Sequence, residues 1–198
     1  MTESDRERWD RKYADREGPA HFRPNWLLTE HRDLLTGSQA LDVACGFGGN
    51  ALYLASLGYQ VDAIDVSAVA LARAQQEARR RGLQVNLVQA DLARWWLPPS
   101  HYDLISVFFY LNRELLPLLS ATLRPGGLLF QANHNKRFLE IRPGFNPDYL
   151  LGPGELQRLA GIAGLEILHY ADSLADRLYN SEIIARRPAQ PDLGKHNG

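Results

Sequence analysis

The chain has almost no cysteine. One of its 198 residues, Cys45, carries a thiol, so no disulfide can form within the chain and no zinc site can be built from several cysteines. The first residues, MTESDRERWDRKY, are charged and lack the apolar segment of an export signal. From these two absences we expect a protein that works in the cytoplasm.

Long apolar runs and an excess of one charge are also missing. No apolar run approaches the ~20 residues that a membrane-spanning helix needs. The 22 basic and 23 acidic residues leave a net charge of -1, which gives no indication of nucleic acid or an anionic membrane as a partner. With 45% hydrophobic residues, the chain is long enough for one domain with a sizeable core.

Strand-like and helix-like stretches alternate from residue 39 onward. We expect strands at 40–44, 60–66, 84–90, 103–109, 127–133, 165–172 and 179–187, and helices at 49–58, 67–82, 112–127 and 152–164. Ser67 should cap the second helix and Gly82 should end it. The alternation predicts an α/β fold of three layers, with a doubly wound parallel sheet covered on both faces. The last two strands have no helix between them and should pair antiparallel at the sheet edge.

The ends of the chain are expected to stand apart from this domain. Residues 1–38 should form a helical segment, because Trp9 and Tyr13 have the i, i+4 spacing of one helix face. This segment should break at Gly18-Pro19 and continue as a short helix at 25–35. The domain itself is expected at 39–187, with a disordered tail at 188–198.

A glycine-rich turn, within LDVACGFGGNALYLA (41–55), follows the first expected strand. In doubly wound sheets ligands bind beyond the carboxyl ends of the strands, and Gly46 and Gly48 leave the backbone open there. The spacing Gly46-x-Gly48-x-x-Ala51 also matches a dinucleotide fingerprint, but Asp42 would oppose a pyrophosphate. Asp42 favours a cationic ligand, and S-adenosylmethionine, which has ammonium and sulfonium centres, meets that requirement. The alternative is that Asp42 caps the next helix.

Two more aspartates follow the second and third expected strands. Asp65 lies near the ~20-residue offset from Asp42 at which an acidic side chain meets ribose hydroxyls. Asp91 can accept from an adenine amino group while the backbone N–H of Leu92 reaches a ring nitrogen. Helix capping is the alternative for both, and Asp62 competes with Asp65 but lies in mid-strand. Together, the three strand-end aspartates predict an adenosyl ligand.

A family resemblance follows from five segments: LDVACGFGGNALYLA, VDAIDVSAVAL, VQADL, YDLISVFFYL and LRPGGLLF. In this order they resemble the motifs of class I S-adenosylmethionine-dependent methyltransferases, over about residues 39–133. Within the class, WDRKY, PGEL and EIIARR resemble small methyltransferases of the tellurite-resistance and thiopurine type. One departure is Ala44, which replaces the first glycine of the usual turn. Its methyl group should leave the turn intact and pack more tightly against the cofactor.

The resemblance implies a Rossmann-like methyltransferase fold, with a seven-stranded sheet whose last strand is antiparallel. It also implies that N-terminal aromatics, Trp9, Tyr13 and by extension Phe22, close over the cofactor as a lid. The alternative is that these rings pin their helix to the core. The residues expected to bind the cofactor are Trp9, Tyr13, Asp42, Ala44, Gly46, Gly48, Asn50, Asp65, Val66, Asp91, Leu92 and Phe108.

The acceptor side is less well defined by the sequence. Methyl transfer releases a neutral thioether and needs no acid, and a base is needed only where the nucleophile keeps its proton. Histidine titrates near neutrality, which makes His134 a candidate base, although a bystander role is more common for a loop histidine. Cys45 should serve as a small apolar residue. The acceptor-side candidates are Tyr110, His134 and Tyr149, with Asn112 and Arg113 as possible lining residues.

The sequence therefore favours an S-adenosylmethionine-dependent methyltransferase with a small-molecule acceptor, because the compact chain lacks an added domain for RNA or protein recognition. Two alternatives stay open: a non-catalytic S-adenosylmethionine-binding module, and an NAD-dependent oxidoreductase. The latter is disfavoured by Asp42, by Asp91 and by the lack of a second substrate domain. We expect no metal, no nucleic acid and no membrane partner, and a monomer or homodimer.

Overall fold

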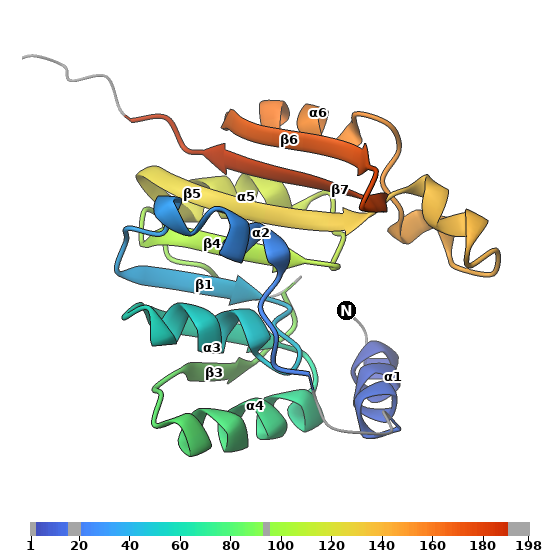
Figure 1. Ribbon diagram of the computed structural model, residues 1–198. Coiled ribbons are helices and arrows are strands. Elements are labelled where there is room, and N and C mark those ends of the chain that lie inside the picture. Colours follow the sequence, from blue (N-terminus) through green and yellow to red (C-terminus); the bar gives the residue numbers. More distant parts are fainter. Residues whose placement is uncertain (1–2, 16–20, 93–95, 190–198) are drawn as a thin grey trace, which may run out of the picture.

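The computed structural model describes residues 3–15, 21–92 and 96–189. These residues form one seven-stranded sheet of order β3-β2-β1-β4-β5-β7-β6, with helices around it (Figure 1). The strands are β1 (Gln39–Val43), β2 (Gln60–Asp65), β3 (Asn86–Gln89), β4 (Tyr102–Phe108), β5 (Leu123–His134), β6 (Glu166–Leu174) and β7 (Arg177–Arg186). The helices are α1 (Glu3–Ala14), α2 (Trp26–Glu30), α3 (Gly49–Ser56), α4 (Ala68–Arg81), α5 (Leu115–Thr122) and α6 (Glu155–Ile162). Short 3-10 turns are η1 (Arg32–Leu34), η2 (Lys136–Glu140) and η3 (Pro147–Tyr149).

The sheet is parallel from β3 to β5, and β7 runs antiparallel to both of its neighbours, β5 and β6. This confirms the predicted α/β class and the antiparallel last strand. The strand order reverses between β1 and β4, because the chain proceeds outward from β1 to β3 and then returns to β4. In an open α/β sheet, such a switch point leaves a crevice outside the carboxyl ends of the strands.

Apolar side chains cover both faces of the sheet. One buried cluster joins the sheet to α2, α3 and α4, for example through Leu27, Leu54 and Leu71. The other joins it to α5 and α6, for example through Leu119 and Leu156. The predicted three-layer arrangement is therefore present, and it fixes the strand ends on which the loops converge.

The predicted ends of α4 are confirmed. The Ser67 side chain accepts a hydrogen bond from the Ala70 N–H, and Gly82 ends the helix at φ 66. Arginines occupy the last turn of α4, where positive charge meets the negative end of the helix dipole. Local sequence signals were sufficient to predict both ends of α4.

One predicted helix is too long. The sequence pattern favours a helix over 112–127, but α5 ends at Thr122 and Leu123 already pairs with Tyr102 of β4. Pro125 has no N–H to donate to a helix, so the chain enters β5 before the glycines. None of the helices in the described part of the chain is long and apolar enough to span a membrane. Most of the expected tail, residues 190–198, and the expected break at Gly18-Pro19 lie outside the described residues.

Candidate active site

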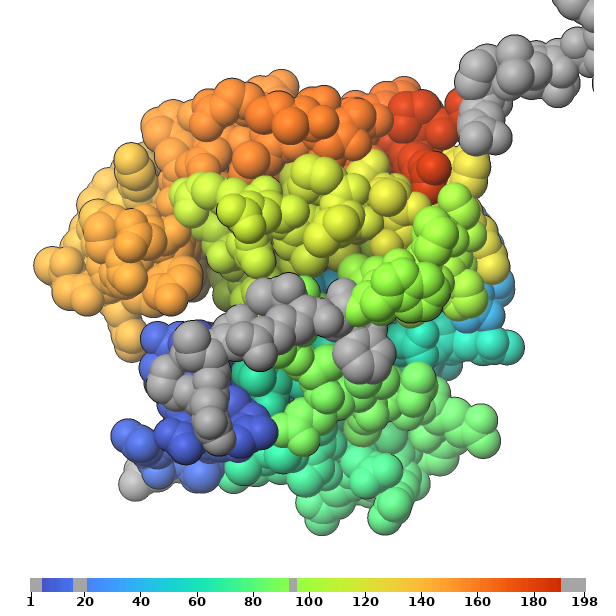
Figure 2. Space-filling model, turned by 180° about the vertical axis from the view of Figure 1, so that it is seen from behind, coloured from blue at the N-terminus to red at the C-terminus, as the bar shows by residue number. Residues whose placement is uncertain are grey.

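A cavity of about 1140 Å³ opens beyond the carboxyl ends of β1, β2, β4 and β5. Figure 1 places α1 and the segment after β5 at this edge of the sheet, and Figure 2 shows a notch between them from behind. Twelve of the fifteen site residues in the predicted set line the cavity: Trp9, Tyr13, Ala44, Gly46, Asn50, Asp65, Val66, Leu92, Phe108, Tyr110, His134 and Tyr149. The cavity wall does not include Asp42, Gly48 or Asp91.

The glycine turn after β1 has three residues in the left-handed region: Ala44 at φ 53, Gly46 at φ 54 and Gly48 at φ 76. Gly46 faces α1, and a Cβ there would come within 2.7 Å of the Tyr13 hydroxyl. Gly48 faces α4, and a Cβ there would lie 3.0 Å from the Ala74 methyl. Gly48 therefore serves helix packing. For the alanine at position 44, which lines the cavity, this conformation costs about 1–2 kcal/mol.

Asp65 holds the turn in place from the end of β2. One carboxylate oxygen accepts from the Gly46 N–H at 2.7 Å and the other from the Ser67 N–H at 2.9 Å. The side chain is buried, and burial raises its pKa above the ordinary value although these hydrogen bonds act in the opposite direction. The Val66 N–H acts on the same carboxylate, which still has acceptor capacity at the cavity. Asp65 is thus both a structural clamp and a hydrogen-bond acceptor at the cavity.

Asp42 does not line the cavity, and its predicted action on a cationic ligand stays a prediction. Its side chain is 0% exposed, and it accepts from the Ala51 N–H at 3.2 Å and from the Ser106 hydroxyl at 2.7 Å. Asp42 lies beside Ser106 across the β1–β4 pair, which turns its carboxylate toward the first turn of α3. The helix-capping alternative therefore describes it. Burial raises the pKa of Asp42 to about 7.

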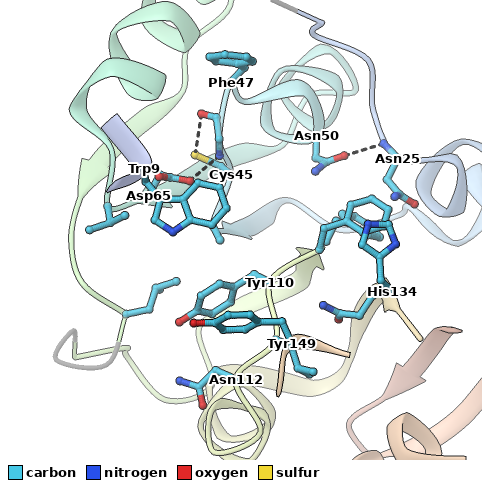
Figure 3. A pocket seen from close by; sticks show the side chains of 18 of the residues that line it. Trp9, Asn25, Cys45, Phe47, Asn50, Asp65, Tyr110, Asn112, His134 and Tyr149 are labelled. Carbon is cyan, nitrogen blue, oxygen red and sulfur yellow. Dashed lines mark hydrogen bonds between the residues drawn. The ribbon is translucent and has the colours of Figure 1, made fainter. Parts of the chain in front are cut away.

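Asn50 connects this buried carboxylate with the cavity. Its amide nitrogen lies 3.5 Å from an Asp42 oxygen, and its amide oxygen accepts from the Asn25 N–H at 2.8 Å, as Figure 3 shows. The Asn25 side chain accepts in turn from the Leu27 N–H and caps α2. Asn25 also lines the cavity but was missed from the sequence. The sequence places Asn25 at the start of the expected helix 25–35, but it does not show that the fold brings this residue to the cavity.

Aromatic rings of α1 cover the glycine turn. Trp9 and Tyr13 lie 5.8 Å apart between ring centroids, and Tyr13 meets Phe47 edge-on at 4.9 Å. Asp10, on the same helix, accepts from the Ser67 hydroxyl at 2.6 Å and from the Val69 N–H at 3.3 Å. Phe22 packs against Phe47 at 6.3 Å without lining the cavity. The first helix is therefore fastened to the start of α4.

The third strand-end aspartate lies off the cavity wall. Asp91 follows β3 and is half-buried, whereas the next residue, Leu92, is buried and lines the cavity. Its predicted contact with an adenine group stays a prediction. Of the three aspartates in the predicted row, Asp65 is thus the one that lines the cavity in the described structure.

Comparisons with known proteins now separate a methyl donor site from a dinucleotide site. Residues 40–127 match the family model described as a methyltransferase domain. Over 170 residues the chain is 31% identical to the ubiquinone biosynthesis O-methyltransferase of Azoarcus sp. (strain BH72), covering 74% of this chain and 70% of that protein. The chain belongs to the class I S-adenosylmethionine-dependent methyltransferases.

Solved structures share the fold of this methyltransferase. A S-adenosylmethionine-dependent methyltransferase from Aquifex aeolicus superposes with a TM-score of 0.69 at 19% identity, covering 89% of this chain and 97% of that one. A structure reported for the conversion of a disulfide bond into a thioacetal group during echinomycin biosynthesis gives a TM-score of 0.73 at 22% identity, covering 92% and 93%. The methyltransferase uses S-adenosylmethionine and acts on a small-molecule acceptor. The narrower tellurite-resistance and thiopurine resemblance stays a prediction.

On the acceptor side of the methyltransferase, Arg113 is a clamp. Its guanidinium donates to the Glu155 carboxylate and, at 2.8 and 3.1 Å, to the backbone oxygens of Asp148 and Leu150. These bonds hold the segment that brings Tyr149 to the cavity. Arg113 therefore positions the wall, and it also lines the cavity. Asn112 also lines the cavity.

Cys45 and Tyr110 also line the cavity. Burial raises the pKa values of the Cys45 thiol and the Tyr110 hydroxyl, so both groups stay protonated and neutral at physiological pH. Cys45 is buried, which fits a small apolar residue in a tight turn. Neither group is activated as a nucleophile, and methyl transfer does not require one from the enzyme.

Proposed function

We propose that S-adenosylmethionine binds along the glycine turn beneath α1, and that the acceptor enters from the side of β4 and β5. The observation that supports this proposal is that one cavity includes both Asp65 at the end of β2 and His134 at the end of β5. Figure 3 shows Asp65 and Trp9 at one side of this cavity and His134 at the other. A donor and an acceptor can therefore lie next to each other in this cavity.

The residues present fit the donor. Asp65 keeps lone pairs for ribose hydroxyls, while Val66, Leu92 and Phe108 give apolar surface for an adenine ring. The Asp42 carboxylate lies behind Asn50, so it acts on a positive charge through this amide and at a distance. The rings of Trp9 and Tyr13 suit a sulfonium cation.

In this proposal the chain contributes alignment. S-adenosylmethionine, when bound, supplies an electrophilic methyl group for backside displacement. Asp65 and the glycine turn fix one end of the donor, and the segment held by Arg113 shapes the acceptor side. Holding the two reactants in near-attack geometry supplies several kcal/mol, roughly 7–11 in the best cases. Trp9 and Tyr13 exclude water from the sulfonium.

We expect Asp65→Ala to weaken S-adenosylmethionine binding by at least about 1 kcal/mol, or roughly fivefold in Kd, because charged hydrogen bonds to the ribose are lost. Calorimetry with S-adenosylmethionine, its demethylated product and NAD measures this. Asp62→Ala is the matched control: Asp62 accepts from the Tyr102 hydroxyl and the Asn86 amide and does not line the cavity. An unchanged Kd in Asp65→Ala, or a preference for NAD, would contradict the assignment.

We propose that residues 1–38 carry a lid on the domain formed by 39–187: α1 closes over the donor, whereas Leu27 and Leu28 of α2 are anchored in the core. Asp10→Ala should then weaken S-adenosylmethionine binding about fivefold, because α1 loses its bonds to Ser67 and Val69. The α4 helix keeps its own cap, since Ser67 still accepts from the Ala70 N–H, so stability should change by less than about 1 kcal/mol. Asp10→Asn, which retains one acceptor oxygen, should stay within about twofold of the wild type. Calorimetry and urea unfolding measure the two quantities. Equal affinity in all three proteins would rule out the lid.

The cytoplasmic location, the monomeric or homodimeric state and the independence from nucleic acid stay predictions of the sequence. The non-catalytic alternative has its own test. Binding of S-adenosylmethionine without turnover over thiols, halides, tellurite, amines and phenols would favour it.

A further inference from the structure

An aromatic wall lines the cavity on the side of β4 and β5. We use this name for Trp26, Phe109, His134 and Phe145, all of which line the cavity. Ring centroids are 5.8 Å apart for Trp26 and Phe109, 4.7 Å for Phe109 and His134, and 6.2 Å for His134 and Phe145. The four rings come from α2, the ends of β4 and β5, and the segment after β5. Such a convergence gives a surface on which a flat ring can stack.

Phe109 in this wall is strained. Its φ is 57°, and its N–H is fixed to the Ala132 carbonyl at 2.8 Å. The left-handed conformation costs about 1–2 kcal/mol in a residue with a Cβ, and glycine would adopt it without that cost. The side chain is nevertheless large, apolar and 45% exposed toward a cavity. Strain retained for an exposed ring indicates that the ring contacts a ligand.

A hydrogen bond to Asn180 orients the imidazole of His134. Its Nδ1 lies 2.8 Å from the Asn180 side-chain oxygen. Because that oxygen accepts, the proton sits on Nδ1 and the lone pair on Nε2. Phe138 stacks on the imidazole at 3.9 Å and fixes its plane. Burial lowers the pKa of His134, and the positive charge of Arg142 acts in the same direction, against the bonds to Asn180 and Tyr179. The ring is therefore neutral and able to take a proton.

From the aromatic wall, the strained Phe109 and the oriented His134, we infer that the acceptor is a flat aromatic ring with a hydroxyl group, and that His134 is the general base. The inference rests on the proposed function, since it assigns the acceptor half of the same cavity. The hydroxyl proton passes to Nε2, and the acceptor oxygen forms the bond to the methyl carbon. The pair of the broken carbon–sulfur bond stays on sulfur, and the imidazolium later releases its proton to water.

Other acceptor classes fit this half of the cavity less well. A neutral amine becomes a cation as it takes the methyl group, and the positive charge of Arg142 that acts on His134 opposes this, whereas a developing phenolate is stabilised by it. Thiolates and reduced inorganic anions are ionised already and need no base. A saturated alcohol cannot use the aromatic wall for stacking.

The first experiment measures acceptor binding without turnover. Calorimetry of the full chain saturated with the demethylated cofactor compares catechol with cyclohexane-1,2-diol, which carries the same two hydroxyls on a saturated ring. We expect catechol to bind at least about tenfold more tightly, and Phe109→Leu, which keeps an apolar side chain but removes the ring, to remove most of this preference. Equal binding of the two diols would overturn the aromatic assignment.

The second experiment tests His134 with two acceptors of the same shape. His134→Gln should reduce methylation of catechol at least about 100-fold and change methylation of thiophenol, which is ionised at pH 8, by less than about threefold. The wild-type rate with catechol should fall at acidic pH, where His134 is protonated, and the rate of the variant should not show this fall. The control is His101→Gln, an exposed histidine that packs on Tyr102 at the opposite end of β4, which should leave both rates unchanged.

The outcomes separate this inference from the proposed function. Failure of S-adenosylmethionine to bind would remove the proposed function. Binding of S-adenosylmethionine together with methylation of tellurite or amines, and of no aromatic acceptor, would overturn the aromatic acceptor alone. An equal loss with catechol and thiophenol in His134→Gln would show that His134 has a structural role.

Discussion

Gly49→Ala is expected to lower the free energy of unfolding by about 2 kcal/mol and to weaken S-adenosylmethionine binding about tenfold. A Cβ at this position would overlap the carbonyl oxygen of Arg23 and lie 3.0 Å from its carbonyl carbon and 3.2 Å from that of Phe22. These are backbone atoms, which cannot rotate away as a side chain can. The segment that carries Arg23 and Asn25 to the cavity must therefore move away from α3.

The matched control for this substitution is Gly161→Ala. Gly161 lies within α6, and a Cβ there would meet no atom within 4 Å. Alanine is favoured over glycine in a helix by about 0.5–1 kcal/mol, so this variant should be more stable than the wild type. Urea unfolding followed by circular dichroism measures both variants. If Gly49→Ala also gained stability, the close packing of residues 22–23 on α3 would be wrong.

Asp42→Asn is expected to remove a pH dependence of stability. The pKa of Asp42 is raised from 3.8 to about 7 in the folded chain, so the folded state binds more protons than the unfolded state between these values. The stability that this group contributes is full below the unfolded pKa and is lost as the pH rises through about 7. Between pH 5 and 8 the wild type should therefore lose more than about 2 kcal/mol relative to Asp42→Asn. Urea unfolding at several pH values measures this difference.

The same carboxyl should link cofactor binding to proton release. A cationic donor near Asn50 favours the ionised form of Asp42, so the wild type should release a proton when S-adenosylmethionine binds near pH 7. Its affinity should rise about tenfold from pH 6 to 8. Calorimetry in phosphate and Tris buffers measures the proton count, and Asp42→Asn should release none. Equal release in both proteins would assign the titration to another group, such as Asp65.

Most helices and strands could be predicted from the sequence because the residues that define them lie close together in the chain. Ser67 and Gly82 bound α4 through contacts within one turn, and the lack of a helix between β6 and β7 required their antiparallel pairing. The end of α5 was misplaced for the opposite reason. Leu123 belongs to β5 because it pairs with Tyr102 in a neighbouring strand. An apolar helical pattern in the sequence does not predict that pairing.

The same difference between local signals and contacts of distant segments holds for the residues of the site. Asp65 lines the cavity as expected, because a residue at a parallel strand end projects to a known edge. Asp42 shares that pattern and yet is buried, since Ser106 of β4 and the Ala51 N–H of α3 meet its carboxylate. Asn25, Trp26 and Phe145 were missed because their spacing in the sequence indicates nothing about the cavity to which the fold brings them.

By itself the sequence determined the α/β class, the order of elements from residue 39, the glycine turn and the family. The first three depend on periodicity or on residues only a few positions apart, and the family depends on the resemblance of its motifs to those of known methyltransferases. The tertiary structure decided which carboxylates reach the cavity, that Arg113 is a clamp, and that rings from four segments form an aromatic wall. These depend on which strands and helices become neighbours, and contacts between distant parts of a chain exist only once the chain has packed.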